Sequence, residues 1–203
     1  MKLGDVVQLL RNRARSGESG LDEVIIRSIN SAIEEVVELR PWWWLWRYVT
    51  VSTDAQGQAS VSPRMVYSPQ EYGVLLTSSG ERVKYGSPEE SGLLSGSSPQ
   101  VWMAWADPAS NTTILKVWPA ASYSGLQLGG YFAVSTFNPA AWDPNATNPC
   151  LEYASGLVIT RAWIEVAHYL GRMTTPEAHR LWIEYLQTTM GIAPEATSAW
   201  RRE

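Results

Sequence analysis

The chain has 203 residues, of which 45% are hydrophobic and 18% charged, with eleven Trp, two His and one Cys. This composition indicates a globular protein with a core of its own rather than a disordered chain. The formal net charge of −4 argues against a protein that grips nucleic acid through its own net charge. The single cysteine excludes an internal disulfide and a multi-cysteine zinc site. No signal peptide or membrane span is recognisable, so we expect synthesis in a reducing cytosol and no membrane contact.

Residues 1–41 are expected to form an N-terminal helical hairpin. Apolar residues recur at three- and four-residue spacing from Leu3 to Leu10, and an apolar stripe of the same period runs from Ile25 to Val37. Pro41 should end the second helix, because the residue before a proline avoids the helical conformation.

Residues 42–147 change to short stretches of alternating polar and apolar residues separated by turn signals. Such strands, with no helical pattern between them, predict an antiparallel β-sandwich or a small barrel. A Gly/Ser loop at 87–100 is either a hairpin tip or a segment ordered by a partner. Gly129 and Gly130 lie inside a predicted strand and are expected to mark a bulge.

Residues 148–191 are expected to form a C-terminal helical hairpin, followed by a docking tail at 192–203. Asn148 and Pro149 should open a helix over Cys150–Leu170 that is apolar nearly all round, so it lies at the centre of a bundle or is partly covered by another subunit. Thr174 to Glu177 form a capping pattern for the next helix, and Gly191 should end it. The predicted fold is α+β: terminal helices in a small bundle of about four helices, with an inserted antiparallel β-sandwich or barrel-like region.

Candidate catalytic groups do not converge. Cys150 lies at a helix start, but no histidine is near it in sequence. Glu165 and His168 form one Glu-x-x-His step, whereas di-metal bundles need two. We therefore expect no catalytic residues, no metal and no cofactor, and a protein that is not an enzyme.

Tryptophan is the unusual feature of the chain. The segment Trp42–Trp46 holds four indoles in five residues, at the junction of the helical and strand blocks. Three interpretations are open. The segment is a hydrophobic hinge between the two blocks, or a protein–protein interface in which at least one or two indoles face outward, or a platform on which carbohydrate stacks. The tail ends in Trp200, Arg201 and Arg202, residue types that anchor interfaces.

This organisation resembles the head-to-tail adaptor family of tailed bacteriophages, which includes tail accessory factors, gatekeepers and tubular adaptors of short-tailed phages. Four parts of the sequence carry the resemblance: the helix that runs into the aromatic stop at Trp42–Trp46, the segment Leu115–Ala121, the strand Leu126–Val134, and the Pro149-led helix with Leu157–Leu170.

The resemblance implies a structural virion protein at the head–tail junction, made in the host bacterial cytoplasm. Such adaptors form a homo-oligomeric ring, commonly a dodecamer, between the portal protein and a tail tube or nozzle protein. Double-stranded DNA passes through without sequence-specific binding. The helical part would pack on neighbours and the portal, the β part would point to the tail, and residues 192–203 would dock on the portal.

Two sets of residues follow as interface candidates. The subunit or portal interface would include Trp42, Trp43, Trp44, Trp46, Trp163, Ile192, Trp200, Arg201 and Arg202. The tail-side or lumen loop would include Glu89, Glu90, Leu93 and Leu94. The alternative function is a Trp-rich β glycan-binding module of a tail fibre or receptor-binding protein.

Overall fold

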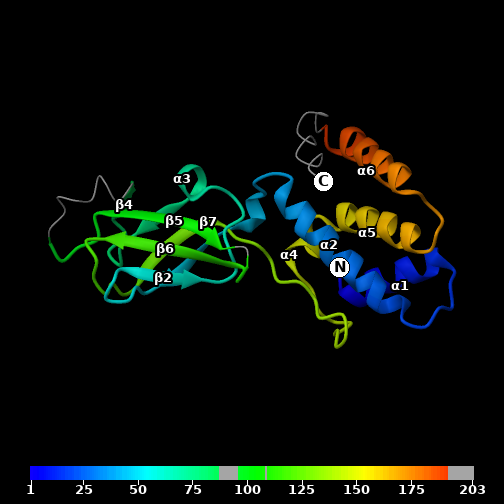
Figure 1. Cartoon of the computed structure of the whole chain (residues 1–203), viewed down its shortest axis with the longest axis horizontal. Helices are drawn as coiled ribbons and strands as arrows, with labels where there is room; N and C mark the ends of the chain where they lie inside the picture. The colour runs from blue at the N-terminus through cyan, green and yellow to red at the C-terminus, as the bar shows by residue number, and fades with distance from the viewer. Residues whose placement is uncertain (87–95, 108, 192–203) are drawn as a thin grey trace. The chain divides into compact units, whose positions relative to one another are not determined.

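The computed structural model describes residues 1–86, 96–107 and 109–191 (Figure 1). The chain is α+β, as predicted: its N- and C-terminal helices pack together, and a seven-stranded, nearly closed barrel-like sheet lies between them in sequence. It divides into two compact units. Met1–Val36 with the residues from Thr136 onward forms the helical unit, and Val37–Ser135 forms the β unit.

The helical unit is built around one central helix. Its helices are α1 (Leu3–Ala14), α2 (Leu21–Glu38, the last two residues of which belong to the β unit), α4 (Pro149–Tyr153), α5 (Ser155–Tyr169) and α6 (Thr175–Met190). α5 packs against α1, α4 and α6, and it exposes only Gly156, His168 and Tyr169. The apolar circumference of this helix is thus covered largely by the chain itself. None of the helices in the described ranges is both long and apolar enough to cross a membrane.

Capping residues define the helix ends much as predicted. The Asn148 side chain accepts the Leu151 N–H at 3.0 Å at the start of α4. The Thr174 N–H donates to the Glu177 carboxylate at 2.8 Å in the capping box of α6. Gly191 ends α6 in the left-handed conformation, with φ +60°.

The helix predicted over Cys150–Leu170 is broken, which corrects the sequence-based expectation. Ala154 has φ −134° and ψ 27°, so α4 ends there and α5 starts at the next residue. The Ala154 N–H still bonds the Cys150 carbonyl at 2.9 Å, which closes the last turn of α4. Ser155 and Gly156, both weak helix formers, follow the break and give the chain little reason to continue one straight helix.

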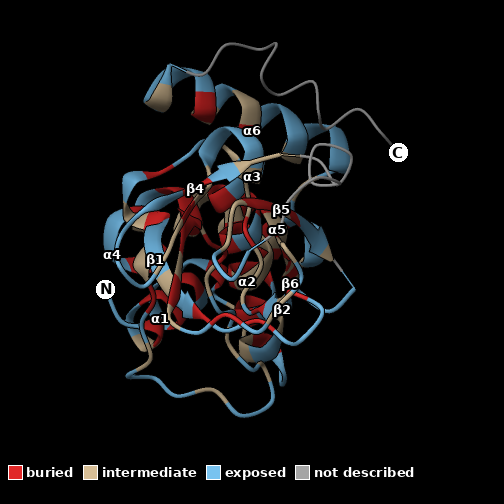
Figure 2. Ribbon diagram, turned by 90° about the vertical axis from the view of Figure 1, so that its left-hand side faces the viewer, coloured by how far each residue is buried: buried red, intermediate tan, exposed pale blue. Residues whose placement is uncertain are grey.

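The β unit contains seven strands in the order β1-β7-β3-β4-β5-β6-β2, and β1 and β2 at the two ends of this order approach each other. A 3₁₀ turn η1 (Trp43–Leu45) precedes β1, and a short helix α3 (Pro69–Tyr72) precedes β3. The strands are β1 (Trp46–Val51), β2 (Gln58–Val61), β3 (Val74–Leu76), β4 (Arg82–Tyr85), β5 (Val101–Asp107), β6 (Thr112–Trp118) and β7 (Leu126–Tyr131). The interior of this unit is filled by apolar side chains, among them Leu75, Trp102, Leu115 and Leu128. Buried residues are coloured red in Figure 2.

One pair of strands departs from the predicted antiparallel pattern. β4 and β5 are parallel, with Lys84 opposite Val101 and Tyr85 opposite Trp102. Parallel neighbours need a crossover connection, so β4 and β5 do not form a hairpin with each other. Most of that segment, residues 87–95, lies outside the described residues.

The predicted bulge at Gly129 and Gly130 is also absent. β7 pairs with β1 in unbroken register through both glycines. A Cβ on Gly129 would lie 2.7 Å from atoms of Tyr48 and Val74, and one on Gly130 would collide with Met65. These glycines therefore leave room for neighbouring side chains to pack close to the backbone of β7. Close approach of neighbouring atoms is, besides a bulge, a common reason for glycine in a strand.

Candidate functional site

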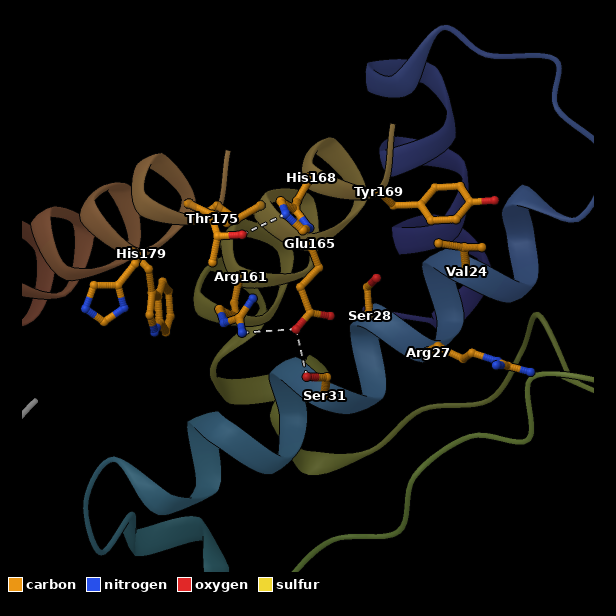
Figure 3. Close-up of a pocket in the computed structure, with 13 residues that line it drawn as sticks. Val24, Arg27, Ser28, Ser31, Arg161, Glu165, His168, Tyr169, Thr175 and His179 are labelled. Carbon is orange, nitrogen blue, oxygen red and sulfur yellow. Dashed lines mark hydrogen bonds and ion pairs between the residues drawn. The ribbon is translucent and has the colours of Figure 1, made fainter. Parts of the chain in front are cut away.

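An open pocket of about 700 Å³ lies between α2, α5 and α6 of the helical unit (Figure 3). Its size is within the range of small-molecule and peptide sites. It is lined by Val24, Arg27, Ser28 and Ser31 of α2, by Arg161, Ile164, Glu165, His168 and Tyr169 of α5, and by Thr175, Ala178, His179 and Trp182 of α6.

A network of charged side chains joins α2 to α5 beside this pocket. Arg161 Nε donates to Glu35 Oε2 at 2.5 Å, and Arg161 Nη2 lies 3.0 Å from Glu165 Oε1. Ser31 Oγ donates to the same Glu165 oxygen at 2.8 Å (Figure 3). The Arg161 guanidinium thus pairs with the carboxylates of both Glu35 and Glu165. When both carboxylates are ionised, the three side chains together carry a net charge of about −1.

Glu35 is the most perturbed acid of the network, with its side chain only 5% exposed. Burial raises its pKa from the ordinary value of 4.5 to about 7, and nearby Glu165 raises it further, against the lowering effect of Arg161. The Trp182 indole N–H also lowers the pKa of Glu35, although it lies outside hydrogen-bonding geometry. Within the described residues, Glu35 Oε1 and Trp182 Nε1 have no hydrogen-bond partner.

Both histidines of the chain line the pocket, but on different helices. His168 Nε2 lies 3.1 Å from Thr175 Oγ1, and His179 is on the exposed side of α6. Glu165, the partner of His168 in the Glu-x-x-His step, is engaged by Arg161. The described residues include no group of three or more His, Cys, Asp or Glu that could hold a metal ion. Glu35 does not line the pocket, and burial between the packed helices is the main cause of its raised pKa.

Cys150 is packed in the helical unit. Its side chain is fully buried, and burial raises the pKa of its thiol to about 12. The helix N-terminus therefore does not activate it, because desolvation disfavours the thiolate more strongly.

The four indoles of Trp42–Trp46 are divided between the core and the surface. Trp42 is 8% exposed, stacks on Trp44 at 5.7 Å and carries the Arg40 guanidinium 4.0 Å from its ring centroid. Trp43 is 72% exposed and Trp46 36% exposed. The prediction that one or two of these indoles face outward is confirmed.

The remaining interface candidates are placed only in part. Trp163 is half-buried within the helical unit, with the Arg13 guanidinium 4.5 Å from its ring centroid. The other candidates lie outside the described residues: Ile192, Trp200, Arg201, Arg202, Glu89, Glu90, Leu93 and Leu94.

Sequence reasoning missed Glu35 and its bond to Arg161. The available signal was a carboxylate inside the apolar stripe of α2, between Ile33 and Val36. An acid in that position is almost never buried unless it is paired.

Comparison with families of known proteins and with curated proteins finds no match to this chain.

Proposed function

We propose that this chain is a structural virion protein without enzymatic activity, a head-to-tail adaptor that assembles with copies of itself into a ring. The ring joins the portal protein to a tail tube or nozzle protein at the head–tail junction and forms part of the DNA conduit. It is made and assembled in the cytoplasm of the host bacterium.

The observation that carries the proposal is the exposed indole of Trp43. This side chain is 72% exposed on the turn η1, while its neighbours Trp42 and Leu45 are buried and hold the turn in place. A large aromatic side chain displayed on a rigid turn loses little conformational entropy on docking, and Trp is enriched among the residues that dominate interface energies. The turn η1, which displays the Trp43 indole, is therefore suited to a contact with another subunit or with the portal.

Two further features support an assembly protein. The terminal helices form a unit separate from the barrel-like sheet, as the resemblance to the adaptor family leads one to expect. Each copy also adds a net charge of −4 to a ring. An acidic ring repels phosphate, so DNA can slide past it without adhering.

The glycan-binding alternative is less well supported. Stacking of a sugar needs an open, flat aromatic face, and Trp43 lies on a turn rather than on a strand. The rings around Trp46 meet edge to face, with interplanar angles of 74° and 88° to Tyr131 and Tyr48. Rings that meet edge to face do not form the flat surface on which a sugar ring stacks.

The experiment compares the wild-type protein with Trp43→Ala and with Trp105→Ala, a matched control whose indole is 47% exposed on β5. Sedimentation velocity with and without purified portal rings measures self-association and portal binding. We expect Trp43→Ala to weaken association by at least about tenfold and Trp105→Ala to leave it near wild type. Equal losses in both variants would refute the assignment to Trp43, and a wild-type protein that stays monomeric beside portal rings would refute the adaptor.

A further inference from the structure

A second cavity, of about 370 Å³, lies on the β unit and has a distinct chemistry. Three aromatic and two oppositely charged side chains line it, from β1, α3, β4 and β7: Trp46, Tyr72, Tyr131, Glu71 and Arg82. Trp46 and Tyr72 are each 36% exposed. We call this cavity the aromatic box.

Tyr131 stands at a steep angle to each of the other two rings of the box. Tyr131 is the central wall, and Trp46 meets it at 74° with 5.1 Å between ring centroids. Tyr72 meets it at 80° and 5.8 Å, and Tyr67 supports both tyrosines at 5.7 Å. The Tyr67 hydroxyl donates to the Val37 carbonyl at 3.0 Å, which fixes this support.

The register of the sheet explains why the rings meet. Trp46 and Tyr131 are directly opposite on β1 and β7, so their side chains leave the same face of the sheet. α3 ends at Tyr72, one residue short of β3, which is the other neighbour of β7. The walls are therefore in place before any ligand arrives, which lowers the entropic cost of binding.

The two charged residues of the box are available to a ligand. Glu71 and Arg82 are both exposed, and in the described part of the chain neither side chain has a hydrogen bond or an ion pair. Elsewhere in the β unit, by contrast, Arg64 and Glu38 pair at 2.8 Å.

From this geometry we infer that the aromatic box binds an organic cation, such as a quaternary ammonium group. The faces of Trp and Tyr attract a cation within about 6 Å of the ring centroid, and perpendicular rings can present several faces to one ligand. Glu71 supplies the compensating negative charge, and Arg82 can receive an anionic group on the same ligand. A flat sugar is a poorer fit, because Tyr131 stands at 74° to Trp46 and at 80° to Tyr72.

The test is calorimetric titration of the intact protein with choline and with its neutral isostere 3,3-dimethylbutan-1-ol, at constant ionic strength. We expect saturable choline binding with a dissociation constant on the order of millimolar and a response to the neutral isostere at least about fivefold weaker. N-acetyl-arginine amide and N-acetyl-lysine amide form a second arm. Tighter binding of either amide than of choline would identify the cation as a basic side chain of a partner chain.

Charge and ring variants locate the site. Glu71→Gln should weaken choline binding by about fivefold, whereas Glu81→Gln, an exposed carboxylate outside the box, should not. Trp46→Leu should weaken it by about fivefold and Trp105→Leu should leave it unchanged. Equal binding of choline and its neutral isostere, no binding of any cation, or binding of oligosaccharides instead would overturn the inference.

Discussion

The buried carboxylate of Glu35 makes a specific prediction about stability and pH. Its pKa is about 7 in the folded protein against an ordinary value of 4.5, so the native state binds this proton more tightly than the unfolded chain. The stability that Glu35 contributes is fully present below about pH 4.5 and is lost as the pH rises through about 7. Each pKa unit corresponds to about 1.4 kcal/mol, so the whole loss is on the order of 3 kcal/mol.

The variant Glu35→Gln removes this titration and keeps the shape of the side chain. We expect the free energy of unfolding of the wild type, relative to Glu35→Gln, to fall by up to roughly 3 kcal/mol between pH 4.5 and 7 and to stay level above pH 7. Urea unfolding followed by far-ultraviolet circular dichroism reports mainly on the helices and so on the unit that contains the network. Glu34→Gln, an exposed neighbour on α2, is the matched control and should show no such relative change. Parallel pH profiles for the wild type and Glu35→Gln would refute the reasoning.

Three further predictions concern packing and helix ends. Gly129→Ala should lower the free energy of unfolding by about 1–3 kcal/mol in urea, because its Cβ would press on the β1 and β3 side chains, whereas Gly17→Ala, which meets nothing within 4 Å, should change it by less than about 0.5 kcal/mol. Thr174→Ala should cost about 1 kcal/mol of stability through loss of the α6 capping box, and an equal effect of Thr188→Ala, inside the same helix, would contradict this assignment. Cys150 should resist a thiol reagent such as 5,5′-dithiobis(2-nitrobenzoate) at pH 8 until urea unfolds the protein; rapid labelling of the native protein would show that the thiol is neither buried nor of raised pKa.

The helix termini were predictable because their signals are local. Asn148, the Thr174 capping box and Gly191 act on backbone groups within four residues, and the structure uses all three. The interruption at Ala154 was not predictable from periodicity, because the apolar spacing continues across it and only the weak helix formers after it point to a break.

The sheet order and both cavities depend on contacts between residues far apart in sequence. Alternation identifies strands but does not say which strands pair, so the parallel β4–β5 pair was missed. The same limit hid the aromatic box, since Trp46 and Tyr131 become neighbours only through the register of β1 and β7. Arg161 and Glu35 likewise belong to helices more than a hundred residues apart.

The most direct test of the proposed function is electron microscopy of the purified protein mixed with portal rings. The adaptor proposal predicts class averages in which a second, rotationally symmetric ring is stacked on the portal. Portal rings that remain bare, beside a protein that stays monomeric at every concentration tested, would contradict it.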